Sequence, residues 1–283
     1  MPKKCLVFSS LIFGLALCTH QAVVAIAYAD FNEGKAAYDR GDYATAYKEL
    51  NPLAEQGNGA AQWYLGVMYY NGQGVPKDCA EALKWLSKAA DQGHAGATYK
   101  LGEMYHSGKC EPQDYAEAVK WFQKAADHGF SLAEYRLGVA YANGEGVPQD
   151  YTEAAKWFRK LAQQGDASSQ FHLGVLYYNG QGVQQDYAEA VKWFREAANQ
   201  GFPSAQYNLG MAYTYGEGVQ HDFVQAYMWF DLAAVQGISD AEQARDNLAA
   251  KMTPAQKAEA LRLAREWKPK AKDRGFPTSS DSR

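Results

Sequence analysis

Apolar and polar positions recur along most of the chain with a period of 36 residues. A Leu-Gly pair returns at every step from Leu65 to Leu209, and a tryptophan column that starts at Trp85 keeps the same step. Within one period, apolar residues follow helical spacing over 60–70 and again over 79–91. A fixed period of this length, with two helices in each unit, is typical of a solenoid of helix hairpins.

Two features of the period have a physical reason. Gly66 stands in the middle of the first helix, where glycine costs about 1 kcal/mol against alanine, so its recurrence predicts a close approach of another helix. Asp78 precedes the second helix and Glu81 follows three residues later, and this spacing predicts a reciprocal capping box. The recurring acidic pair could instead bind a metal, but no clustered ligand set accompanies it.

The full motif runs Tyr/Trp-x-Leu-Gly-x-x-Tyr, Gly-x-Gly-Val-x-x-Asp, Glu-Ala-x-x-Trp and Ala-Ala-x-x-Gly. It resembles the Sel-1-like repeat, a family of tetratricopeptide-like α/α solenoids, in a form exported by bacteria. The resemblance implies an all-α superhelical solenoid of helix hairpins that binds other proteins. We expect a shortened tetratricopeptide-like unit at 30–57, full repeats at 58–93, 94–129, 130–165, 166–201 and 202–237, capping helices at 238–268, and a flexible tail at 269–283.

The N-terminus has the layout of a secretory signal peptide. Lys3 and Lys4 precede an apolar stretch over 6–17, and the small residues Ala27 and Ala29 form a cleavage site. We therefore expect residues 1–29 to be removed and the protein to lie in the periplasm or cell envelope of a bacterium. Two alternatives are a lipid anchor on Cys18 and an uncleaved membrane anchor.

The distribution of charge separates the repeats from the C-terminal segment. Residues 30–250 hold 17 basic and 28 acidic side chains, a net charge of −11, which disfavours binding to nucleic acid. Residues 251–274 hold eight basic and three acidic side chains, a net charge of +5. This segment predicts either a capping helix with a solvated basic face or a weak contact with an anionic surface. We expect a monomer.

No catalytic motif is present. The chain lacks Gly-x-Ser-x-Gly, His-Glu-x-x-His, a Walker loop, and the Ser-x-x-Lys and Lys-Thr-Gly pair of serine β-lactamases. We predict a protein that is not an enzyme and holds no cofactor or metal; a penicillin-binding or β-lactamase-like hydrolase is a less favoured alternative. The five histidines outside the signal stand in different repeat columns and are expected at the solvated surface: His94, His106, His128, His172 and His221.

The first helix of each repeat has positions that vary from one repeat to the next. In tetratricopeptide-like solenoids this helix lines the concave groove, so a mixed aromatic and charged stripe there predicts a surface for a protein partner; the alternative is a stripe that is only solvated. The leading function is a non-catalytic scaffold or regulator, and the alternative is a structural part of an envelope assembly for secretion, motility or polysaccharide export. The candidate partner-binding residues are Tyr64, Val67, Tyr70, Lys100, Glu103, His106, Arg136, His172, Tyr178, Asn208 and Thr214.

Two cysteines outside the signal depart from the repeat pattern. Cys79 stands where the other second helices begin with an aromatic residue, and Cys110 stands where the other turns carry glycine. Two independent changes to the same rare residue favour one disulfide, which an exported protein could form. The alternative is two free buried thiols.

Overall fold

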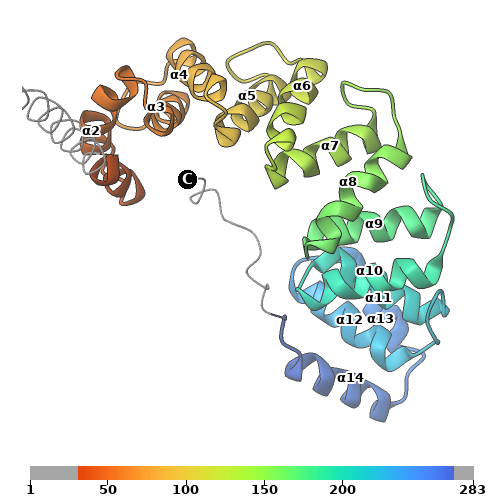
Figure 1. Cartoon of the computed structure of the whole chain (residues 1–283). Coiled ribbons are helices and arrows are strands. Elements are labelled where there is room, and N and C mark those ends of the chain that lie inside the picture. Colours follow the sequence, from red (N-terminus) through yellow and green to blue (C-terminus); the bar gives the residue numbers. More distant parts are fainter. Residues whose placement is uncertain (1–30, 271–283) are drawn as a thin grey trace, which may run out of the picture. The chain divides into compact units, whose positions relative to one another are not determined.

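The computed structural model describes residues 31–270, which divide into two compact units: one ends at Asp114 and the other begins at Tyr115. The described residues form helices and turns without strands (Figure 1). This confirms the predicted all-α solenoid of helix hairpins. The predicted signal peptide, and the predicted tail from residue 271 onward, lie outside the described residues.

Each repeat contributes two helices of 13 residues, which we call helix A and helix B. The first unit begins with a helical stretch over 31–39 and continues with α2 (Tyr43–Glu55), α3 (Gly59–Asn71), α4 (Cys79–Asp91) and α5 (Ala95–Ser107). The second unit holds α6 (Tyr115–Asp127), α7 (Ser131–Asn143), α8 (Tyr151–Gln163), α9 (Ala167–Asn179), α10 (Tyr187–Asn199), α11 (Pro203–Tyr215), α12 (Phe223–Val235), α13 (Ser239–Ala249) and α14 (Pro254–Glu266).

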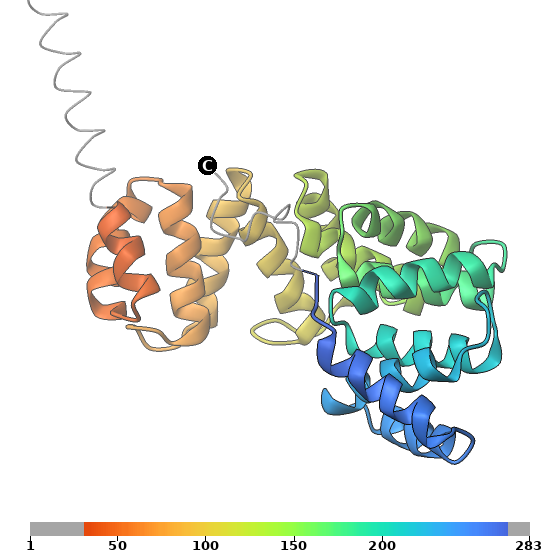
Figure 2. The same cartoon turned by 90° about the horizontal axis from the view of Figure 1, so that it is seen from below.

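Neighbouring helices along the chain pack against each other in both units. The first unit pairs α2 with α3, α3 with α4, and α4 with α5. In the second unit the same order of contacts runs from α6 to α13, and α14 returns to pack on α12 (the dark blue helix of Figure 2). None of the helices within residues 31–270 has the length and apolar composition needed to cross a bilayer.

The predicted close approach at Gly66 is confirmed. A Cβ atom added there would lie 2.6 Å from Leu86 Cγ, on helix B of the same repeat. At Gly138, in the equivalent position of α7, the added atom would lie 2.7 Å from the ring of Phe158. Glycine therefore lets helix A and helix B of one hairpin pack closer than any side chain would allow.

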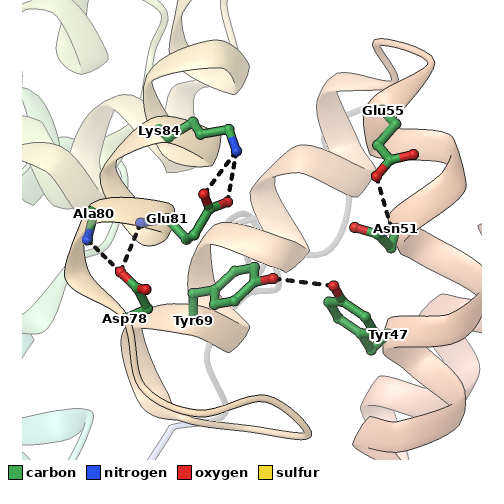
Figure 3. Close-up of polar contacts among 8 residues, drawn as sticks. All are labelled: Tyr47, Asn51, Glu55, Tyr69, Asp78, Ala80, Glu81 and Lys84. Carbon is green, nitrogen blue, oxygen red and sulfur yellow. Dashed lines mark hydrogen bonds and ion pairs between the residues drawn. The ribbon is translucent and has the colours of Figure 1, made fainter.

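The start of helix B differs in part from the prediction (Figure 3). Asp78 Oδ1 accepts from the backbone N–H groups of Ala80 and Glu81 at 2.9 and 3.1 Å, as an N-cap should. The reciprocal half of the capping box is wrong. The Glu81 carboxylate binds Lys84 at 2.8 Å. The Asp78 N–H donates to the carbonyl of Tyr69 at 3.0 Å. The complete box occurs at Thr253, at the start of α14.

A ladder of buried glutamines joins consecutive hairpins. Gln62, Gln170 and Gln206 each donate from Nε2 to the carbonyl eight residues earlier, at 3.0 to 3.3 Å. Each side-chain oxygen accepts at 2.8 Å from the glutamine thirty residues later, at the end of helix B of the same hairpin. Each ladder glutamine therefore ties its own hairpin to the helix B before it. In the third repeat this position holds Glu134, which is buried.

Candidate functional site

All eleven predicted partner-binding residues lie on the A helices α3, α5, α7, α9 and α11, and all are half-buried. Half-burial means that each side chain rests on a neighbour and still reaches the surface. The contacts they make therefore decide which groups face a partner and which serve the fold. We describe the two units separately.

In the first unit, side chains from consecutive A helices meet. The ring of Tyr64 packs edge-on against Tyr38, with centroids 5.0 Å apart, and this burial raises the pKa of the Tyr64 hydroxyl. One repeat later, Lys100 Nζ lies 4.3 Å from the ring centroid of Tyr70 and forms an ion pair with Glu103 at 3.3 Å. Tyr70, Lys100 and Glu103 thus form one continuous surface across α3 and α5.

In the second unit, His172 is part of the packing. Its ring stacks on Phe158 with centroids 4.9 Å apart, and its Nε2 lies 3.0 Å from the Tyr135 hydroxyl. Burial lowers the pKa of His172 below its ordinary value. The expectation that all five histidines are solvated is therefore wrong for His172, and also for His94, whose Nδ1 caps α5 and whose ring stacks on Trp63.

Tyr178, at the end of α9, lies in a small polar cluster. Its hydroxyl donates to Glu217 Oε2 at 2.7 Å, and this carboxylate raises the pKa of Tyr178 to about 12. The ring of Tyr187 meets it edge-on at 5.1 Å. Tyr215, at the end of α11, is 65% exposed. Sequence reasoning missed Tyr187, Tyr215 and Glu217, although an aromatic residue in the otherwise polar column of Tyr215 was a visible signal.

The remaining candidates are less informative. The Thr214 hydroxyl donates to the carbonyl of Gly210 at 2.8 Å, within its own helix, so it serves α11. Val67, His106, Arg136 and Asn208 are half-buried at the positions that the helical pattern predicts.

Cys79 and Cys110 are joined by a disulfide, with their Cα atoms 5.1 Å apart. Cys110 has a φ of 77°, and among residues 31–270 it is the non-glycine residue whose backbone is left-handed. In other turns glycine holds this place; a Cβ on Gly146 would meet the backbone of Tyr115, which begins a B helix as Cys79 does. The disulfide therefore uses a close approach of two backbone segments that recurs in the solenoid.

Residues 31–270 contain no group of three or more His, Cys, Asp or Glu side chains placed to hold a metal ion. An open recess of about 430 Å³ borders the start of α10, and none of the eleven candidates lines it. Its lining residues are Arg159, Tyr177, Val183, Gln184, Gln185 and Asp186.

An all-α array of hairpins with a mixed aromatic and charged stripe on the A helices defines a helical-repeat protein of the kind that binds other proteins. The chain belongs to the Sel1 repeat family: the family model matches residues 59–94, 95–130, 131–166, 167–202 and 203–238. Proteins with Sel1 repeats generally mediate protein–protein interactions, and this scaffold is generally non-catalytic.

Among the solved structures that resemble the chain, two are similar in both sequence and fold. One is the protective antigen c5321 of uropathogenic Escherichia coli strains, with 35% identity over 89% of this chain and a TM-score of 0.76; this chain spans 56% of that one. The other is a Sel1 repeat protein from Oxalobacter formigenes, with 35% identity, a TM-score of 0.69, and coverage of 84% of this chain and 100% of that one. No curated protein sequence matches the chain.

Proposed function

We propose that the protein is a non-catalytic scaffold or regulator of the bacterial cell envelope that binds a protein partner through its A helices. The observation that carries the proposal is the contact of Tyr70 on α3 with Lys100 on the next A helix, α5, where Lys100 also pairs with Glu103. Such contacts hold aromatic and charged groups in fixed positions while leaving them partly open to solvent, which suits recognition of a folded partner or a peptide.

The envelope location rests on the signal-like pattern of residues 1–29, and the binding role rests on membership of the family. The B helices of the first four repeats are less suited to binding because their tryptophan rings lie under lysine side chains of the same helix. Lys84 and Lys88 lie 5.0 and 4.7 Å from the ring centroid of Trp85. The A helices are therefore the surface to test first.

Site-specific photo-crosslinking in living cells tests the proposal. A photoreactive amino acid at Arg136 or Asn208, on the A helices, should capture a discrete partner in the envelope fraction. The matched controls carry it at Lys156 and Lys192, exposed positions on B helices. Equal capture from the B-helix positions would contradict the proposed surface, and capture of cytoplasmic proteins alone would contradict the proposed location.

A further inference from the structure

The second unit carries a group of three tyrosines and one carboxylate at the C-terminal ends of α9 and α11 and the start of α10. We call it the tyrosine cluster and define it as Tyr178, Tyr187, Tyr215 and Glu217. Tyr178 joins the group through its 2.7 Å hydrogen bond to Glu217 and its edge-on contact with Tyr187. Tyr215 ends α11, two residues before Glu217 in the sequence. Tyr187 and Tyr215 are 38% and 65% exposed, so the cluster opens to solvent.

An equivalent tyrosine in the first unit shows which groups bind at this position. Tyr70 occupies the place of Tyr178 three repeats earlier, and its ring carries two ammonium groups. Lys100 Nζ lies 4.3 Å from its centroid, and Lys77 Nζ lies 5.9 Å away. A cation over a tyrosine face is attracted by the negative face of the ring. In the first unit, two lysines of the same chain thus lie over the ring of this tyrosine.

The residues that supply those cations are replaced around Tyr178. The equivalent of Lys77 is Gln185, and the equivalent of Lys100 is Asn208. A third lysine of the first unit, Lys109, corresponds to Glu217. Around Tyr178, two amides and one carboxylate therefore stand at the positions where the first unit has three lysines.

One further replacement enlarges the aromatic surface. Ser107, two positions before Lys109, corresponds to Tyr215. The cluster thus combines a tyrosine without its internal cations, a second exposed ring, and a carboxylate bound to the first tyrosine. Residues 115–250 around it hold 9 basic and 16 acidic side chains, a net charge of −7, which attracts a positively charged partner.

We propose that the tyrosine cluster binds an arginine or lysine side chain of a partner protein. The cation takes the place that Lys100 fills on Tyr70, with Tyr215 beside it and the Glu217 carboxylate as its counter-charge. Arginine fits best, because its planar guanidinium stacks on aromatic rings and also donates to a carboxylate. This inference rests on the proposed function and specifies the chemistry of the partner.

The test is an NMR titration of the ¹⁵N-labelled full chain with N-acetyl-arginine methylamide. We expect saturable shifts in amide signals of Tyr178, Tyr187, Tyr215 and their neighbours, with a dissociation constant of about 1 mM or weaker, as suits one exposed side chain. The matching citrulline compound has the same shape without the charge. Equal shifts with citrulline, or arginine shifts centred elsewhere, would overturn the proposal.

Two variants and one control locate the binding groups. Glu217→Gln keeps an acceptor for the Tyr178 hydroxyl but removes the charge, and Tyr215→Ala removes an exposed ring; each should weaken arginine binding about three- to fivefold. Glu145→Gln removes the same charge from the equivalent turn position two repeats earlier and should leave binding unchanged. Unchanged binding in both cluster variants, or an equal loss in Glu145→Gln, contradicts the assignment.

The outcome can be separated from that of the proposed function. If Arg136 and Asn208 crosslink to a partner and that capture survives Glu217→Gln and Tyr215→Ala, the A-helix surface stands and the cluster assignment fails. If the cluster binds arginine but no partner is captured from the A helices, the site stands and the proposed function fails.

Discussion

Glu134 is the one charged member of the buried glutamine ladder, and its replacement by glutamine should stabilise the protein. Its side chain is 3% exposed; one oxygen accepts from Lys160 Nζ at 2.8 Å and the other is buried without a hydrogen-bond partner. The pattern of Gln62, Gln170 and Gln206 places a carbonyl, that of Ala126, eight residues before it. A carboxylate cannot donate to a carbonyl, whereas a glutamine amide can.

The magnitude follows from three contributions. A new amide-to-carbonyl hydrogen bond is worth about 1 kcal/mol, and removing a buried unpartnered carboxylate oxygen recovers about 1–3 kcal/mol. The lost ion pair with Lys160 offsets about 1 kcal/mol or less, because that lysine is 51% exposed and returns easily to water. Glu134→Gln should therefore raise the free energy of unfolding by about 1–3 kcal/mol, because the new hydrogen bond and the removal of the buried carboxylate oxygen together outweigh the lost ion pair.

Urea unfolding followed by circular dichroism measures the change, and hydrogen exchange of the α7 amides locates it. Glu153→Gln is the matched control, because it removes the same charge from an exposed ion pair with Lys156 in the same repeat and should change stability by less than about 0.5 kcal/mol. If Glu134→Gln destabilises the protein by more than the control does, the Glu134–Lys160 pair outweighs its desolvation and the reasoning is refuted.

Three further changes test other parts of the structure. Gly182→Ala should cost about 2–3 kcal/mol in a urea titration, because φ is 66° and the added Cβ would meet the backbone of Tyr151, whereas Gly165→Ala, with open space at a φ of 91°, should cost about 1 kcal/mol. Thiol titration of the unfolded, unreduced chain should find no free Cys79 or Cys110, and reduction should lower stability by about 3 kcal/mol. Burial lowers the pKa of His172 in the folded state, so the unfolded chain binds a proton at this imidazole more readily. The free energy of unfolding should therefore fall as the pH falls through about 6.5. His172→Asn should make the urea midpoint less dependent on pH in this range.

The repeat pattern predicted the fold well because its fixed positions are packing positions. Leu65 is fully buried and Gly66 lies against Leu86 of helix B, and the equivalent glycines of the last three repeats lie against a phenylalanine of theirs, so this recurrence alone indicates two packed helices. The helix bounds followed from Asp78 as N-cap and from the glycines of the turns. The reciprocal capping box at Glu81 could not be predicted, since Lys84 competes for the same carboxylate and the cap amide already has the Tyr69 carbonyl.

The candidate surface was predicted less fully, because a position that varies between repeats can vary for two reasons. A side chain can differ because it faces a partner or because it fills a local space. Lys100 lies over the ring of Tyr70 at the surface, which fits the first reason. His172 varies in the same column but fills a space beside Phe158 and Tyr135, which only the three-dimensional contacts show. The glutamine ladder was missed because its partners lie eight and thirty residues away, outside any helical period.

In the last repeat, the residues around the tryptophan of helix B differ from those of the first repeat. Lysines accompany the tryptophan of helix B in the first repeat, but Met228 and Leu232 stand in their places beside Trp229. Trp267, just after α14, meets Trp229 edge-on with ring centroids 6.1 Å apart, and α14 packs along α12. In the second unit, Lys124, Lys160 and Lys192 likewise lie over the tryptophan rings of α6, α8 and α10, whereas α14 packs along α12 in the last repeat. Because α14 packs along a B helix, we expect a partner on the A helices first.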